Sequence, residues 1–150
     1  MRPGLNQTIA FPVRVAAFVY IGLILSIIRV CLLLLPFKSV CKLTSSFADL
    51  SKRAPVLKLL GLDASDIAGL VNAAARRSPG AVTCLPRALT CQTLLAASGF
   101  DSVFQIGVVT DDKGGLKAHA WVEREGLIVI GGQPGLSEFR PLPSMETAGL

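Results

Sequence analysis

Residues 84–130, CLPRALTCQTLLAASGFDSVFQIGVVTDDKGGLKAHAWVEREGLIVI, decide the fold, because the spacing of their apolar side chains changes midway. In the first part, leucine and alanine recur at helical spacing, which predicts a helix over residues 84–97. Ser98-Gly99 then supplies the glycine that commonly ends a helix. The helix is therefore expected to stop just before the pattern changes.

The second part of the stretch has the pattern of strands. Residues 103–109 are rich in β-branched side chains, and residues 110–115, TDDKGG, form a turn cluster. Residues 118–123 and 127–130 then predict a hairpin around Glu125-Gly126. Helices followed by an antiparallel meander indicate an α+β fold.

A second helix is expected before residue 84. Asp63 or Ser65 can cap it, apolar residues recur at helical spacing up to about Arg77, and Ser78-Pro79-Gly80 ends it. Residues 38–60 predict only a short helical or irregular linker, because Pro55 interrupts any helix there.

The N-terminal part is apolar. Residues 15–37 are interrupted only by Arg29 and closed by Pro36, and the uninterrupted part, residues 15–28, is shorter than the roughly 20 residues of a membrane span. Arg29 adds roughly 2.5 to 3.5 kcal/mol to the cost of insertion, which several leucines can offset. Three interpretations stay open: a span, a core helix, and the favoured one, a helix buried on one side by the domain and resting on a membrane by the other. No small-x-small cleavage site follows, so a secretory signal is not expected.

Length and charge limit the possible classes. A chain of 150 residues suits one domain, so residues 1–60 are taken as part of the same unit as the core, residues 61–150. Residues 1–60 carry eight Lys/Arg against the single acid Asp49, which suits an anionic membrane surface or an acidic partner. Nucleic acid is not expected as a partner, because no recognition motif or aromatic interleaving accompanies the basic residues.

The four cysteines indicate reduced thiols. On one helix, Cys84 and Cys91 would lie roughly 10 Å apart, beyond the reach of a disulfide. Zinc is not expected either, because the chain has one histidine and no Cys-x-x-Cys pair. No cofactor is predicted, and the location expected is cytoplasmic, with membrane association left open.

Cys84 is the candidate nucleophile. It stands at the predicted start of a helix, where unpaired amides and the helix dipole favour a thiolate. The same amides can stabilise the oxyanion of a tetrahedral intermediate. Cys31, Cys41 and Cys91 are interpreted as buried structural residues.

His119 is the candidate base. It is the only histidine, and it follows Cys84 by thirty-five residues on a predicted strand that can face a helix packed on the sheet. Trp121, two residues further, is either a core residue or a wall of a peptide cleft. Arg87, one turn beyond Cys84, either binds substrate carbonyls or forms a structural ion pair.

Two blocks resemble a known family. Thr83-Cys84-Leu85-Pro86-Arg87-Ala88-Leu89 and Ala118-His119-Ala120-Trp121-Val122-Glu123 are similar to the leader peptidase of lasso-peptide biosynthesis, a transglutaminase-like, papain-like cysteine protease. The resemblance covers roughly residues 67–142. It implies removal of the leader from a ribosomally synthesised precursor before a partner ATP-dependent lasso cyclase closes the ring. It also implies a separate leader-recognition protein.

The third residue of the family pattern is missing. The family places an Asp about a dozen residues after the histidine, where this chain has Gly131 and Gly132. Stepping back along the predicted hairpin from Arg124 opposite Leu127 places His119 opposite Gly132. The substitutes that can be named are Gln105, Glu123 and Gln133, and none is assigned.

Two rival functions stay open beside the peptidase. An acyltransferase of the transglutaminase class would use the same Cys84 and His119 but pass the acyl group to an amine. A catalytically weak scaffold would bind the precursor or the cyclase, and the glycines at 131 and 132 favour it. The sequence leaves the oligomeric state open.

Overall fold

The computed structural model describes residues 10–143, so the outer ends of the segments 1–60 and 61–150 lie outside the described part. The helices are α1 (Phe11–Leu34), α2 (Phe37–Ser51), α3 (Val56–Leu59), α4 (Ala64–Arg77) and α5 (Cys84–Ala97). The strands are β1 (Val103–Thr110), β2 (Leu116–Arg124), β3 (Leu127–Ile130) and β4 (Arg140–Pro141), with the 3-10 helix η1 (Leu136–Glu138) before β4.

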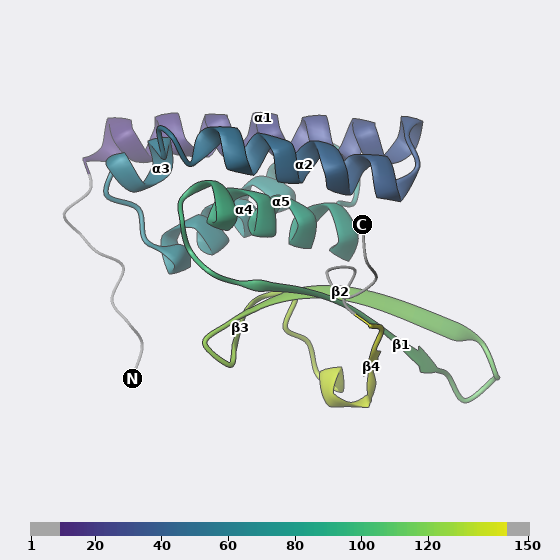
Figure 1. Cartoon of the computed structure of the whole chain (residues 1–150). Coiled ribbons are helices and arrows are strands. Elements are labelled where there is room, and N and C mark those ends of the chain that lie inside the picture. Colours follow the sequence, from purple (N-terminus) through teal and green to yellow (C-terminus); the bar gives the residue numbers. More distant parts are fainter. Residues whose placement is uncertain (1–9, 144–150) are drawn as a thin grey trace.

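The elements form layers on a small sheet. α1 and α2 lie in the outermost layer, and α4 and α5 lie between them and the sheet (Figure 1). α5 contacts β2, and α1 contacts both α4 and α5. η1 lies on the other side of the sheet, away from the helices (Figure 1). The α+β fold with helices on an antiparallel sheet and an apolar N-terminal helix is therefore confirmed.

The two predicted helices are confirmed. α5 has the predicted bounds, and Gly99 follows it with φ +75°, a conformation that glycine adopts without strain. α4 begins with a capping box in which Asp63 accepts a hydrogen bond from the Asp66 amide at 2.8 Å and Asp66 accepts one from the Asp63 amide at 3.2 Å.

The prediction of a short helical or irregular linker over residues 38–60 underestimates its helix, although the interruption at Pro55 is confirmed. α2 is a helix of 15 residues that starts directly after Pro36. Its buried residues, Val40 and Ala48, lie on the face that packs on α5, so tertiary contacts stabilise a helix whose serine and threonine content is unfavourable. Pro55 starts α3.

The sheet has the strand order β3-β2-β1-β4, with each neighbouring pair antiparallel. Arg124 pairs with Leu127 as predicted, and Glu125 and Gly126 between them have φ values of 53° and 77°, as a type I′ turn requires. A register shift follows, because Glu123 pairs with Ile128 but Val122 pairs with Ile130. The pairing ends there, so the expected pairing of His119 with Gly132 is wrong.

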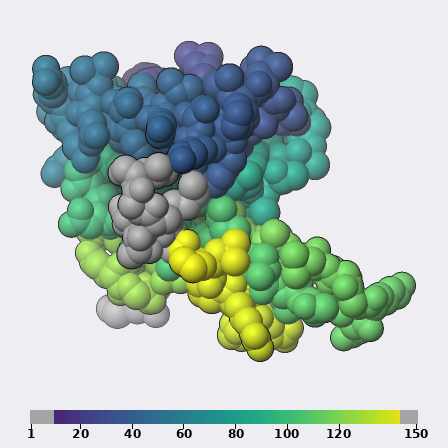
Figure 2. Space-filling view, turned by 45° about the vertical axis from the view of Figure 1, so that its right-hand side comes forward, coloured from purple at the N-terminus to yellow at the C-terminus, as the bar shows by residue number. Residues whose placement is uncertain are grey.

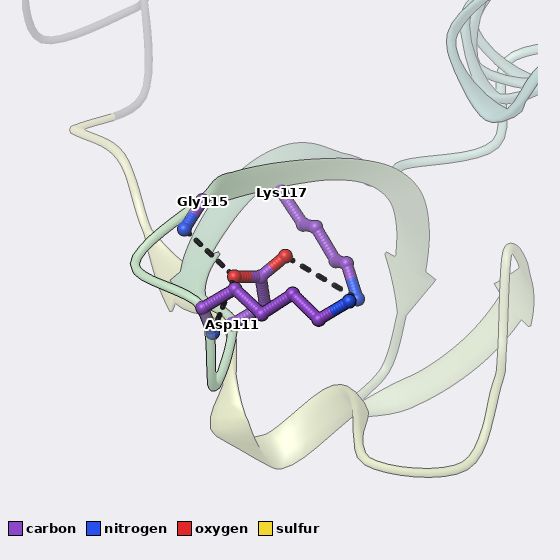
Figure 3. A network of polar contacts seen from close by, with 4 residues as sticks. Asp111, Gly115 and Lys117 are labelled. Atoms are coloured by element: carbon purple, nitrogen blue, oxygen red, sulfur yellow. Dashed lines mark hydrogen bonds and ion pairs between the residues drawn. The ribbon is translucent and has the colours of Figure 1, made fainter.

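The β1–β2 hairpin projects from the body of the molecule (Figure 2). Asp111 closes its turn: Oδ1 accepts hydrogen bonds from the amides of Lys113 at 3.0 Å and Gly115 at 2.7 Å, and Oδ2 lies 3.9 Å from Lys117 Nζ (Figure 3). An Asp side chain that accepts hydrogen bonds from nearby backbone amides in this way stabilises a turn. They give the charged turn a structural role.

Candidate active site

Cys84 is the first residue of α5 and is half-buried, with a free thiol. No acidic residue stands in the first turn of α5. The partial positive charge of the helix N-terminus therefore meets no competing carboxylate in the first turn of its own helix.

The start of α5 leaves amides free for an oxyanion. Thr83, the N-cap residue, makes no side-chain capping hydrogen bond, and Pro86 has no amide hydrogen. Within residues 10–143, the N–H groups of Cys84 and Leu85 have no backbone acceptor. These two donors are next to the thiol, where the oxyanion of a thiol adduct would form.

His119 is buried, with 8% of its surface exposed, and its Nε2 lies 2.7 Å from the carbonyl oxygen of Gly131. A carbonyl oxygen only accepts, so Nε2 carries the hydrogen and neutral His119 has its lone pair on Nδ1. Nδ1 makes no hydrogen bond among the described residues. The ring is held further by Trp121, whose centroid is 6.2 Å away, and by Phe139 at 5.6 Å.

Gly131 holds this carbonyl in place through a conformation that only glycine adopts readily. Its φ is +84°, and a Cβ there would lie 2.7 Å from the Ala120 carbonyl oxygen and 2.8 Å from Trp121 Cβ. No aspartate fits at this position. A main-chain carbonyl thus contacts the ring nitrogen at the point where the family pattern places a carboxylate.

None of the three side chains named as substitutes for the missing aspartate lies in hydrogen-bond contact with His119. Glu123 Oε1 accepts a hydrogen bond from Trp121 Nε1 at 2.7 Å, so it is already occupied. Gln105 pairs with Trp121 across the β1–β2 ladder, and Gln133 is exposed. Within the described chain, none of them is hydrogen-bonded to His119.

The structure does not join Cys84 and His119 by a hydrogen bond. Ala120 and Val122 belong to the core beneath the helices, and Cys84 packs against that core. Side chains alternate along a strand, so His119 points to the opposite face of β2, where Phe139 covers it. The sequence-based expectation that His119 faces the helix layer therefore differs from the structure.

Two arginines approach the start of α5. Arg29 of α1 donates a hydrogen bond from Nη1 to the Pro79 carbonyl oxygen at 2.8 Å, which ties α1 to the loop before Cys84. Arg87 Nε is buried without a hydrogen-bond partner, and no ion pair of Arg87 is present among residues 10–143. Of its two predicted roles, the structural ion pair has no partner among the described residues, and substrate binding stays a prediction.

Of the three cysteines interpreted as buried, only Cys91 is buried, whereas Cys31 and Cys41 are half-buried like Cys84. Burial raises the pKa of the Cys91 thiol from 9.0 to about 12 and also raises the pKa of Cys41. Cys91 is fully buried, so it is the least accessible to a substrate. The described residues contain no cluster of three His, Cys, Asp or Glu that could hold a metal ion.

A groove of about 470 Å³ lies beside the segment that covers His119. Its lining includes Val109 and Leu116 of the hairpin, together with Glu138 and Arg140. Phe139, which contacts the His119 ring, stands between these last two residues. The groove therefore flanks Phe139 on the side of the sheet that carries His119.

Sequence reasoning did not identify the Gly131 carbonyl or Phe139. The only available signal for the Gly131 carbonyl was the pair Gly131-Gly132 itself, because a glycine in place of an expected side chain can mark a close backbone approach.

A family model described as Transglutaminase-like superfamily matches residues 31–144, a range that includes both Cys84 and His119. No curated protein and no solved structure gives a significant match.

Proposed function

The chain belongs to the transglutaminase-like superfamily, and from this premise we propose that it is a cysteine peptidase with Cys84 as nucleophile and His119 as base. The observation that carries the proposal is the state of the histidine: Nε2 is fixed by the Gly131 carbonyl, and Nδ1 keeps its lone pair without a partner. A thiol at a helix N-terminus and an oriented imidazole are the two groups that cysteine catalysis needs.

The proposed reaction has two steps. In the first, the His119 Nδ1 takes the thiol proton, Cys84 sulfur attacks the peptide carbonyl carbon, and the amides of Cys84 and Leu85 receive the oxyanion. The C–N bond then breaks, the leaving amine takes the proton from His119, and a thioester remains. In the second, water attacks the thioester while His119 takes its proton, which releases a carboxylic acid and restores the thiol.

Formation of the pair depends on substrate in this proposal. Cys84 and His119 have no hydrogen bond in the free chain, and His119 points to the face of β2 opposite to α5. Substrate binding must therefore turn His119, with its part of β2, toward Cys84. Catalytic hydrogen bonds often form only in the complex with substrate. The Nδ1 lone pair and the groove beside Phe139 are both free to take part in this step.

The proposed substrate is the precursor of a lasso peptide, cleaved between leader and core. The support is the likeness of the Cys84 and His119 blocks to the leader peptidases of that pathway. A separate leader-recognition protein would present the precursor, and an ATP-dependent cyclase would use the product. Arg87, with its free buried Nε, is the residue proposed to bind a substrate carbonyl.

Mass spectrometry of the precursor tests this proposal. The chain is incubated with a precursor and its leader-binding partner, beside Cys84→Ala, His119→Ala and the control Cys91→Ala. Cleavage is expected with the parent chain and with Cys91→Ala, because Cys91 is buried on the same helix and takes no part. Intact precursor in every tube, with binding of the partner demonstrated, would refute the peptidase.

A second candidate is a binding scaffold, which the absence of a Cys84–His119 hydrogen bond among the described residues favours. An acyltransferase using the same pair is the third. Added amine separates the enzymes: a transferase yields the amide of the added amine, whereas a peptidase yields the free acid. A scaffold yields neither product, and its Cys84 reacts with iodoacetamide at the rate of an ordinary thiol, with or without precursor.

A further inference from the structure

α1 presents a continuous row of large apolar side chains to solvent. The members are exposed by 44% to 80% and recur every three or four residues along one face of the helix: Phe11, Val15, Val19, Leu23, Ile27, Val30 and Leu34. We call these seven residues the α1 stripe. Soluble monomers rarely expose an apolar surface of this extent without a binding role.

The opposite face of α1 is part of the core. Ala17, Ile21 and Leu25 have 0% exposure and pack with α4 and α5. Only 22% of the most apolar window of α1 is buried, although its mean hydropathy is 2.5. α1 is therefore an integral helix of the fold with one side covered and the other side bare.

The charge around the α1 stripe is positive. The first acidic residue of the whole sequence is Asp49, and its carboxylate is already paired with Lys52 at 2.9 Å. Lys38 and Lys42 of α2, which lies next to α1, are exposed and have no ion pair in the described chain. A bare apolar helix face with basic neighbours is complementary to a bilayer of anionic lipids.

We infer that the α1 stripe lies in the headgroup region of an anionic membrane, with α1 parallel to the surface. The packing of α1 against α4 and α5 argues against a span, even though its 24 residues, about 36 Å, are long enough. Spanning would pull Ile21 and Leu25 out of the core and break the Arg29–Pro79 hydrogen bond. The inference does not rest on the proposed catalysis.

This orientation points the far side of the sheet away from the lipid. α1 and α2 form the layer farthest from the sheet, and η1 lies beyond the sheet (Figure 1). With the α1 stripe on the membrane, the face of β2 that carries His119 points to the aqueous side. A peptide in solution could then reach the groove beside Phe139.

Flotation with lipid vesicles tests the inference on the full chain. The vesicles are pure phosphatidylcholine, or phosphatidylcholine with 30% phosphatidylglycerol. The parent chain is expected to float with the anionic vesicles, and Val19→Asp/Leu23→Asp to lose at least tenfold of that partitioning. Leu116→Asp/Leu127→Asp is the matched control, because these leucines are 73% and 71% exposed on the sheet. It should float like the parent.

Further experiments distinguish an anionic membrane from other partners of the α1 stripe. Lys38→Glu/Lys42→Glu should lower anionic partitioning by roughly fivefold per lysine or more, and high salt should release the chain. Three outcomes would overturn the inference: no flotation of the parent, equal loss in the control variant, or resistance to salt and alkaline carbonate, which indicates a span. A concentration-dependent dimer that Val19→Asp/Leu23→Asp abolishes, without lipid binding, would assign the α1 stripe to a second copy. Circular dichroism confirms that each variant is folded.

Discussion

The Nε2 atom of His119 lies 2.7 Å from the carbonyl oxygen of Gly131, so a main-chain group orients the candidate base. A carbonyl oxygen carries no full charge and does not stabilise an imidazolium as a carboxylate does. It does fix the tautomer with hydrogen on Nε2. We therefore expect a slower enzyme than one with a carboxylate partner, but one whose imidazole ring is still oriented.

Replacing Gly131 by alanine should damage both stability and activity. The Cβ would lie 2.7 Å from the Ala120 carbonyl oxygen, at a φ of +84°, which costs about 1–3 kcal/mol and displaces the carbonyl from His119. Gly132→Ala is the control, because its Cβ meets only Ile128 Cγ2 at 3.6 Å. Thermal unfolding and precursor cleavage measure the two effects. Equal behaviour of both variants would contradict the role of the Gly131 carbonyl.

Gly107 makes room for the side chains that hold the His119 ring. A Cβ there would lie 2.7 Å from the Trp121 ring and 3.0 Å from Phe139 Cβ. Gly107→Ala should therefore lower the free energy of unfolding by about 1–3 kcal/mol and weaken cleavage. Gly69→Ala, in the interior of α4 with nothing within 4 Å, should instead stabilise by roughly 0.5–1 kcal/mol. Urea unfolding of both variants checks the opposite signs, and the same sign in both would contradict the packing argument.

Arg87 should affect substrate binding more than chemistry. Its Nε is buried without a partner, so Arg87→Met removes a donor that no described residue uses. The expected result is a KM for precursor raised roughly tenfold, with kcat lowered less, because the donor contacts the substrate before and during reaction alike. Alkylation of Cys84 by iodoacetamide, which is too small to need Arg87, serves as the control. A change in kcat alone would contradict a binding role.

Cys91 should make the fold sensitive to alkali. Burial raises the pKa of its thiol from 9.0 in the unfolded chain to about 12 in the fold. Both states hold the proton below pH 9, whereas between pH 9 and 12 only the folded state does, so stability falls as the pH rises through this window. Urea unfolding at pH 8.5 and 10.5 should show a larger loss for the parent than for Cys91→Ala. Parallel losses would show that the Cys91 thiol is not the cause.

Local patterns predicted much of the fold. The bounds of α5 and the cap of α4 at Asp63 follow from spacing and from glycine, proline and aspartate at the ends. The turn at Glu125-Gly126 is likewise a local signal. The length of α2 was not predicted, because its stability depends on packing against α5, which no pattern within residues 38–60 reveals.

The site was only partly accessible to sequence reasoning. Cys84 at a helix start follows from the residues, but a carbonyl partner for His119 cannot be read from side-chain types. Alternate residues of β2 point to opposite faces of the sheet. Ala120 and Val122 face the helices, so His119 lies on the other face, and the sequence does not show which of the two sets the helices cover. The register shift at Val122 ends the pairing before it reaches His119.

The most direct measurement of the central claim is the intact mass of the protein after rapid acid quenching of a reaction with precursor and leader-binding partner. We expect an adduct with the mass of the leader, attached at Cys84 as a thioester and removed by hydroxylamine. Cys84→Ala should form no adduct and no product, and Cys91→Ala should form both. Cleavage that continues in Cys84→Ala would show that Cys84 is not the nucleophile.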